Sequence, residues 1–172
     1  LFGLPQLGKP KAQVLAELIL KETGYAPTYE ARCWDIDGEG DPAGQVLVVA
    51  VDSLEARRSV WQRVKAGLEG GQPRLLLDLR MGAQVARVFA IQPHQAEERA
   101  YYERSLSPSL PPAKAKCSEK SIIYCPLAAA SLGLALLRHW LVGRPHPVEV
   151  AQDLVTFTQV ATFLDGRNGR AA

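Results

Sequence analysis

The chain has 172 residues, of which 47% are hydrophobic, and a formal net charge of +2. This length fits one domain, and the apolar fraction is high enough to build a buried core, which excludes a disordered chain. Basic residues are scattered between acidic ones and form no dense cluster, so we do not expect nucleic acid as a partner.

The cysteines and the hydropathy of the chain indicate in which cellular compartment the protein is expected. Cys33, Cys117 and Cys125 are odd in number and far apart, with no Cys-x-x-Cys pair, so neither a disulfide framework nor a structural zinc site is expected. The first residues lack the charged and apolar pattern of a signal peptide, so we expect none and a cytoplasmic protein. The uncharged stretch at 122–137 is interrupted by proline and glycine and is too short to span a membrane, which favours a core helix.

The first predicted element is a helix that begins near Pro10 and ends at Gly24, because proline suits the first turn and glycine suits the end of a helix. Residues 29–34 alternate like a strand, and the Asp/Gly-rich residues 35–44 predict a turn. Residues 46–51 are continuously apolar, which is typical of a strand buried on both faces of a parallel sheet.

The rest of the chain predicts an α/β fold with a mixed sheet that is partly antiparallel. We find no internal repeat and no linker, so residues 1–172 are interpreted as a single domain. The Ser/Pro/Lys-rich segment at 105–116 predicts a mobile, crossover-like loop. The other expected helices follow residue 52 and span 94–104 and 126–142, and the other expected strands span 74–79 and 85–91. The segment at 147–163 is ambiguous: its pattern favours a strand, and the alternative is that part of it is helical.

Asp52 stands where the apolar strand ends and a helix begins. Ligands of open α/β sheets bind outside the carboxyl ends of the strands, so an acid here is a candidate for phosphate or magnesium chemistry. The alternative is a capping role, in which Asp52 accepts hydrogen bonds from the first helical amides and Glu55 reaches back. The residues alone leave both interpretations open.

Four segments of the sequence form a pattern through their order and spacing. They are a Gly-x-x-Lys helix start at 8–12, a strand-end Asp with an Arg five residues later at 49–57, a strand pair at 82–89, and a cysteine followed by an Ala/Gly-rich helix at 117–133. Together these segments resemble the carboxyl-side portion of the ThiF/MoeB-type adenylating domain, the superfamily that includes the ubiquitin-activating enzymes. The resemblance implies a Rossmann-like sheet with helices on both faces and a partly antiparallel edge, whose first βαβ portion lies before the matched region.

The resemblance implies ATP-dependent adenylation of the C-terminal glycine of a ubiquitin-like or sulfur-carrier protein. It places Lys11 on the ATP phosphates and Asp52 on Mg²⁺, roles that suit chemistry in which negative charge accumulates. Lys11 is otherwise a solvated first-turn lysine, and Lys9 could share its role. Arg57 either belongs to the same nucleotide site or is an ordinary helix arginine.

Cys117 is the candidate nucleophile for a thioester or persulfide link to the carrier. It follows the predicted loop and has lysines near it in sequence, which favour the thiolate if they are also near in space. The alternative is a structural cysteine. Cys33 and Cys125 lie in apolar surroundings and are expected in the core.

The sequence departs from the family pattern in one respect that affects the ATP site. It contains no Gly-x-Gly-x-x-Gly, and the family's phosphate loop and Asn-x-x-Arg-Gln segment precede the matched region. We therefore expect the rest of the ATP site from a longer polypeptide or from a partner, as a homodimer or hetero-oligomer. The alternatives are a non-catalytic subunit that scaffolds a carrier or partner protein, and adenylation of a non-protein acyl group or an RNA base.

Overall fold

The computed structural model divides the chain into two compact units, Leu1–Gly38 and Glu39–Ala172, and each is described here by itself. The residues that the structure describes are 7–29, 44–71, 73–82, 84–107 and 123–164. The predicted strand at 29–34 and the predicted loop at 105–116 therefore lie largely outside the described residues.

The first unit contains one described helix, α1 (Lys11–Thr23), with Pro10 at its N-cap and Gly24 at its C-cap. Gly24 adopts a left-handed conformation with φ 72°, and its N–H donates to the Leu20 carbonyl oxygen at 2.9 Å. Glycine adopts this conformation without the steric cost that other residues incur. The helix predicted between Pro10 and Gly24 is confirmed.

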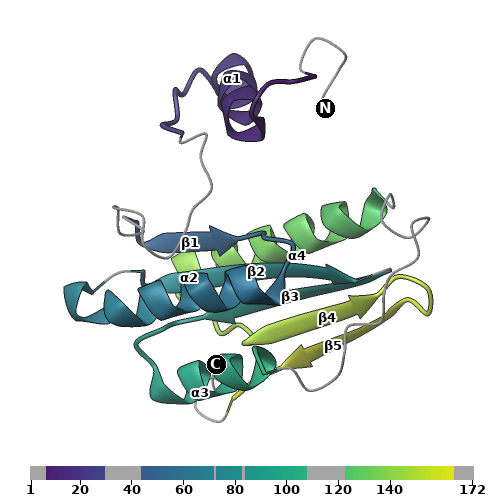
Figure 1. Cartoon of the computed structure of the whole chain (residues 1–172). Coiled ribbons are helices and arrows are strands. Elements are labelled where there is room, and N and C mark those ends of the chain that lie inside the picture. The colour runs from purple at the N-terminus through teal and green to yellow at the C-terminus, as the bar shows by residue number, and fades with distance from the viewer. Residues whose placement is uncertain (1–6, 30–43, 72, 83, 108–122, 165–172) are drawn as a thin grey trace. The chain divides into compact units, whose positions relative to one another are not determined.

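The second unit is built on a five-stranded mixed sheet (Figure 1). Its first strand is parallel to the second, and every other neighbouring pair is antiparallel. The α/β class and the partly antiparallel sheet are confirmed. In spatial order the strands are β1 (Val46–Val49), β2 (Leu75–Gly82), β3 (Val85–Ile91), β4 (Glu149–Asp153) and β5 (Thr158–Thr162).

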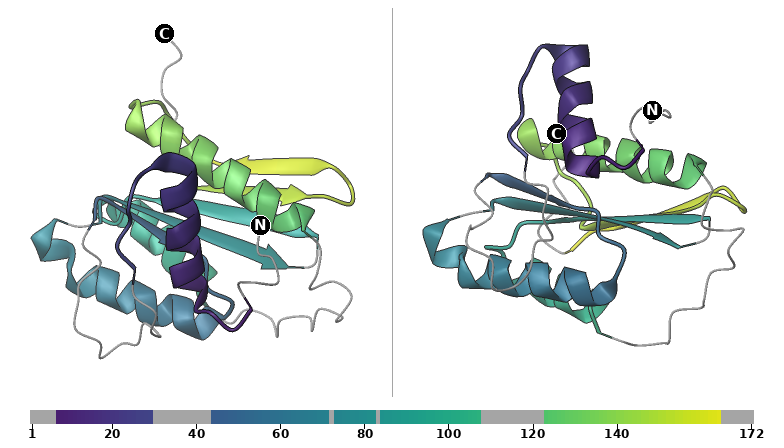
Figure 2. Two further views of the ribbon diagram at one scale, coloured as in Figure 1. Left: turned by 90° about the horizontal axis from the view of Figure 1, so that it is seen from above. Right: turned by 45° about the horizontal axis from the view of Figure 1, so that its top comes forward.

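Helices cover both faces of this sheet, as Figure 2 shows most clearly when the sheet is seen nearly edge-on. On one face, α2 and α3 pack against the strands through Trp61, Tyr102 and Phe89. On the other face, α4 contributes Cys125 and Leu136 to a separate apolar cluster. The helices of this unit are α2 (Leu54–Ala66), the short 3₁₀ helix η2 (Leu68–Gly70), α3 (Ala96–Ser105) and α4 (Tyr124–Leu141).

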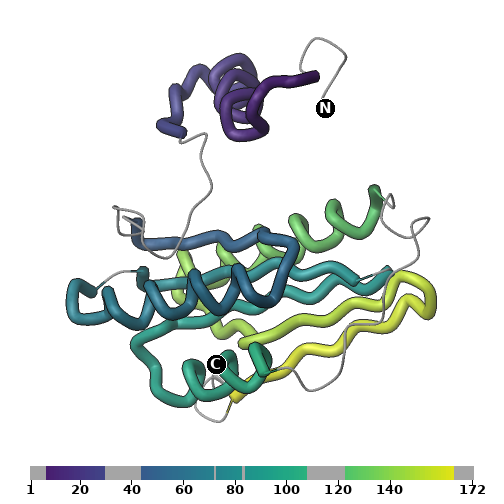
Figure 3. Tube along the Cα trace, viewed as in Figure 1, coloured from purple at the N-terminus to yellow at the C-terminus, as the bar shows by residue number. Residues whose placement is uncertain are grey.

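The ambiguous segment at 147–163 forms a hairpin, whose path from β4 to β5 is visible in the Cα trace of Figure 3. The Asp153 side chain accepts hydrogen bonds from the backbone N–H groups of Val155 (2.8 Å) and Thr156 (3.1 Å), which closes the turn. These bonds lower the pKa of the Asp153 carboxyl. The partly helical alternative for this segment is wrong.

The prediction that residues 46–51 are buried on both faces is also wrong. The strand is shorter, and the Val48 side chain is 56% exposed although Val49 is buried. Among the described strands β1 has a neighbour on one side only, and α4 packs on β2 and β3. Within the described ranges, no helix has the length and apolar character needed to cross a membrane.

Candidate functional site

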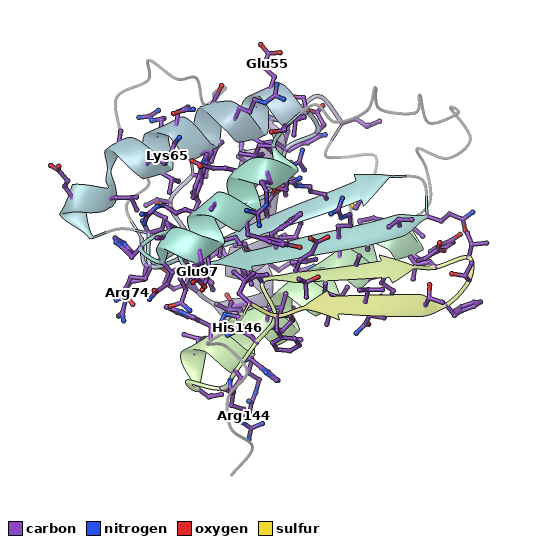
Figure 4. The ribbon with its side chains drawn as sticks, turned by 90° about the horizontal axis from the view of Figure 1, so that it is seen from below. Glu55, Lys65, Arg74, Glu97, Arg144 and His146 are labelled. Atoms are coloured by element: carbon purple, nitrogen blue, oxygen red, sulfur yellow. The ribbon has the colours of Figure 1, made fainter. Side chains whose placement is uncertain are left out.

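The connection between β1 and α2 places Asp52 at the carboxyl end of β1, directly before the first turn of the helix. The N-cap of α2 is Ser53, whose backbone is extended (φ −120°, ψ 151°) and whose Oγ accepts from the Ala56 N–H at 3.1 Å. The predicted capping role of Asp52 is therefore wrong, because the chain continues extended for one more residue before it turns. Glu55 points away from the sheet (Figure 4).

Asp52 is exposed to solvent beside the N-terminal end of α2. The first amides of a helix carry a partial positive charge, so this end of the unit favours anionic ligands such as phosphate. A single exposed carboxylate at such a place is a suitable donor for Mg²⁺, which proteins commonly bind through one or two carboxylates and the phosphates of a nucleotide. The chemistry of Asp52 thus fits a magnesium–nucleotide ligand.

Arg57 is buried, with 7% of its surface exposed, and is not an ordinary solvent-facing helix arginine. Its Nε donates to Asp78 Oδ1 at 2.9 Å. Its Nη1 donates to the Ser53 carbonyl oxygen at 3.1 Å, and its Nη2 to the Leu79 carbonyl oxygen at 3.0 Å. The guanidinium therefore binds protein acceptors on three sides, in the loop before α2 and on β2.

Asp78 is a fully buried carboxylate in the middle of β2, and both of its oxygens are hydrogen-bonded. Oδ2 accepts from Arg80 Nε at 2.6 Å and from the Tyr102 hydroxyl at 2.9 Å. We call Asp78, Arg57, Arg80 and Tyr102 the Asp78 cluster. Two arginines and a hydroxyl compensate the cost of placing a charge out of contact with water.

The Asp78 cluster also fixes the end of α3. Arg80 donates from Nη1 to the Ser105 carbonyl oxygen at 3.1 Å and from Nη2 to Ser105 Oγ at 3.0 Å. Its guanidinium lies 4.2 Å from the centre of the Phe89 ring, a cation–π contact. Burial, and then the negative charge of Asp78, raise the pKa of the Tyr102 hydroxyl, which therefore stays protonated as a donor.

The sequence predicts a strand over 74–79 but assigns no partner to Asp78, so the Asp78 cluster is missed. A signal was present, since Asp78 and Arg80 interrupt an otherwise apolar run. Charged residues are rarely buried without a partner, so a charge inside a strand indicates an opposite charge nearby.

Lys11 belongs to the unit Leu1–Gly38 and Asp52 to the unit Glu39–Ala172, so each residue is described within its own unit. Lys11 is exposed in the first turn of α1. Lys9 forms an ion pair with Glu17 at 3.2 Å. A hydrogen bond from Gln13, followed by the bond from Lys9, lowers the pKa of the Glu17 carboxyl. Lys9 thus has a local partner on α1.

Of the cysteines, Cys125 is in the described part of the chain, whereas Cys33 and Cys117 lie outside it. Cys125 is 2% exposed in the apolar cluster beneath α4, and burial raises the pKa of its thiol. The prediction that Cys125 is a core cysteine is confirmed. Across the described ranges, no group of three or more His, Cys, Asp or Glu residues is arranged to hold a metal ion.

Two of the hollows that the described residues of this unit form are open to solvent, and Asp52 lines neither of these two. The larger, of about 430 Å³, lies along α2 and α3, where Glu103 accepts from Trp61 Nε1 at 3.1 Å and pairs with Lys65 at 3.0 Å. The smaller, of about 360 Å³, includes Arg74, which lies by the end of α2 opposite to Glu55 (Figure 4). Glu103 is thus already bound by two side chains of the larger hollow, and Arg58, which also lines it, donates to the Leu106 carbonyl oxygen.

No protein-family model matches this chain, and a search of curated proteins finds no match either. These comparisons do not test the resemblance to the ThiF/MoeB-type domain, which is therefore a hypothesis based on the sequence.

Proposed function

We propose that this chain forms part of an enzyme that uses ATP to adenylate the C-terminal glycine of a ubiquitin-like or sulfur-carrier protein. The observation that supports it most is the position of Asp52, which is exposed at the carboxyl end of β1 beside the start of α2. Ser53 provides the helix cap, so the Asp52 carboxylate is left for a ligand. The ThiF-type, Rossmann-like assignment of the sheet belongs to the same proposal.

The reaction needs two negatively charged reactants to approach each other. A carboxylate oxygen of the glycine attacks the α-phosphorus of ATP, the new P–O bond forms, and the bond to pyrophosphate breaks. Asp52 would hold Mg²⁺, which would supply the positive charge that reduces this repulsion, and Lys11 would bind the phosphates. Cys117 is the proposed acceptor if the activated carrier is transferred to the protein.

The proposed site needs a phosphate-binding loop in addition to the described residues. Among the described strands, β1 pairs only with β2, which leaves its other backbone edge without a described neighbour. An apolar strand with an open edge is a place where a further strand can add to a sheet. We propose that this strand and its loop come from the full-length polypeptide or from a partner subunit, in a homodimer or hetero-oligomer.

The test is ATP–pyrophosphate exchange by the full-length protein with candidate carriers that end in glycine. We expect Mg²⁺-dependent exchange, which Asp52→Ala lowers by roughly a hundredfold because the metal loses its protein ligand. Glu55→Ala is the matched control, since this exposed acid lies three residues away in the first turn of α2 and should leave the rate unchanged. ATP binding without exchange for every carrier would refute the proposal.

A second candidate is a non-catalytic subunit that presents a carrier or partner to a competent one. The engagement of Arg57 with Asp78 favours it, because this arginine is then occupied by protein acceptors instead of phosphate. This candidate predicts that Asp52→Ala leaves the activity of the complete assembly intact. A large loss of activity in the same variant excludes it.

A further inference from the structure

Arg57 connects the buried Asp78 carboxylate to the backbone next to Asp52. Its Nε binds Asp78 and its Nη1 binds the carbonyl oxygen of Ser53, the residue that follows Asp52. We propose that Arg57, oriented by Asp78, is a positioning residue that holds the β1–α2 loop and thereby sets the place of the Asp52 carboxylate. The consequence for metal binding rests on the proposed function; the hold on the loop does not.

The loop is restrained at both of its ends. At its start, Val49 on β1 pairs with Asp78 on β2, so the strand that leads to Asp52 lies beside the strand that contains the buried acid. At its end, the Ser53 carbonyl oxygen accepts both from Arg57 Nη1 at 3.1 Å and from the Arg57 backbone N–H at 3.3 Å. Asp52 lies between these restraints.

An arginine is suited to this position because its acceptors lie in different directions. Asp78, the Ser53 carbonyl and the Leu79 carbonyl each take a different nitrogen of one planar guanidinium. The fork geometry of arginine is fixed, whereas lysine has a single compact ammonium group. A lysine here can keep the charge beside Asp78 but cannot reproduce all three bonds.

The orientation of Arg57 depends in turn on residues far away in the chain. The second oxygen of Asp78 is held by Arg80 and Tyr102, so the carboxylate cannot rotate freely. Arg80 is itself bound to Ser105 at the end of α3. The place of the β1–α2 loop is thus coupled to β2 and α3 through one buried carboxylate.

The variants Arg57→Lys and Asp78→Asn test this in the full-length protein. Asp78→Asn keeps the side-chain shape and the arginine but removes the charge, so it decides the matter if Arg57→Lys does not fold. Arg87→Lys is the matched control, because Arg87 pairs with Glu149 at 2.8 Å on β3 and β4 without contact to the loop. The first readout is the amide hydrogen exchange of residues 53–57 in the protein without ligand. The second is the rate of ATP–pyrophosphate exchange, measured as a function of the Mg²⁺ concentration and, for the KM, of the carrier concentration.

We expect both variants to accelerate amide exchange at 53–57 by about tenfold, because the loop loses a restraint and opens more readily. We also expect them to raise the Mg²⁺ concentration for half-maximal rate by about tenfold, because loss of a group that orients a metal ligand typically weakens metal binding by about ten- to a hundredfold. The KM for the carrier should stay constant, and Arg87→Lys should change none of these.

Unchanged amide exchange in both variants would overturn the proposal even if the wild type is active. Faster amide exchange with an unchanged Mg²⁺ requirement would overturn its catalytic part. A wild type without pyrophosphate exchange refutes the proposed function, and amide exchange alone then decides whether Arg57 holds the loop.

Discussion

The two faces of the sheet are built from different chemistry. The face covered by α2 and α3 contains the buried Asp78 and Arg57 beside aromatic rings, with the Trp61 and Tyr102 rings 4.8 Å apart in an edge-to-face arrangement. The cluster under α4 is apolar and includes small residues such as Ala129. Apolar packing tolerates volume-conserving exchange, whereas a buried charge network depends on each partner. We infer that the charged network of the first face fixes loop geometry and needs each of its members, whereas the packing of the second face tolerates the exchange of single residues.

The largest effect is expected when Asp78, the acid at the centre of the charged face, is removed. Asp78→Ala leaves Arg57 and Arg80 without their buried counter-charge, and we expect the free energy of unfolding to fall by about 3–5 kcal/mol. Urea denaturation measures it. Lys65→Ala is the control, because its ion pair with Glu103 is partly exposed and is expected to contribute at most about 1 kcal/mol. Equal effects of the two variants would refute a special role for the Asp78 cluster.

A smaller effect is expected in the pH dependence of the free energy of unfolding, to which Tyr102 on the face with the Asp78 cluster contributes. Burial and Asp78 raise the pKa of Tyr102 above the ordinary value of 10.0, so in alkali the unfolded chain loses this proton while the folded chain keeps it. Stability is then complete below the unfolded pKa and decreases above it, by about 1.4 kcal/mol between about pH 9 and about pH 11 for this one group. Chemical denaturation of the wild type and Tyr102→Phe across this range measures it. The variant should show the shallower decline, and parallel curves would contradict the account.

The smallest expected effect is a gain on the apolar face. Gly133 lies in the middle of α4, and a Cβ there would meet the Leu79 side chain at 3.7 Å, an ordinary contact distance. Since alanine is favoured over glycine inside a helix, Gly133→Ala should raise the free energy of unfolding by about 0.5–1 kcal/mol. Thermal unfolding detects this as a higher Tm. A lower Tm would show that the packing of α4 on β2 is tighter than described.

The sequence predicted the elements whose local signals are strong. Proline and glycine marked the ends of α1, and the alternation in residues 85–91 identified β3. These features depend on residues close together in the chain, so patterns reveal them.

The sequence could not predict features that depend on distant contacts or on backbone angles. Asp52 and Ser53 are both good capping residues, and only the extended backbone at Ser53 decides between them. Asp78 binds Arg57 and Tyr102, which are distant in sequence, so its burial follows from the tertiary fold. The exposure of Val48 likewise follows from the order of the strands.

The central claim, that Asp52 holds the metal for adenylation, is tested most directly by intact-mass spectrometry of a candidate carrier. The carrier is incubated with ATP, Mg²⁺ and the full-length protein as wild type, Asp52→Ala or Glu55→Ala. We predict an adenylated carrier with the wild type and with Glu55→Ala, and almost none with Asp52→Ala. Equal amounts of the adenylated carrier with all three proteins would contradict the account.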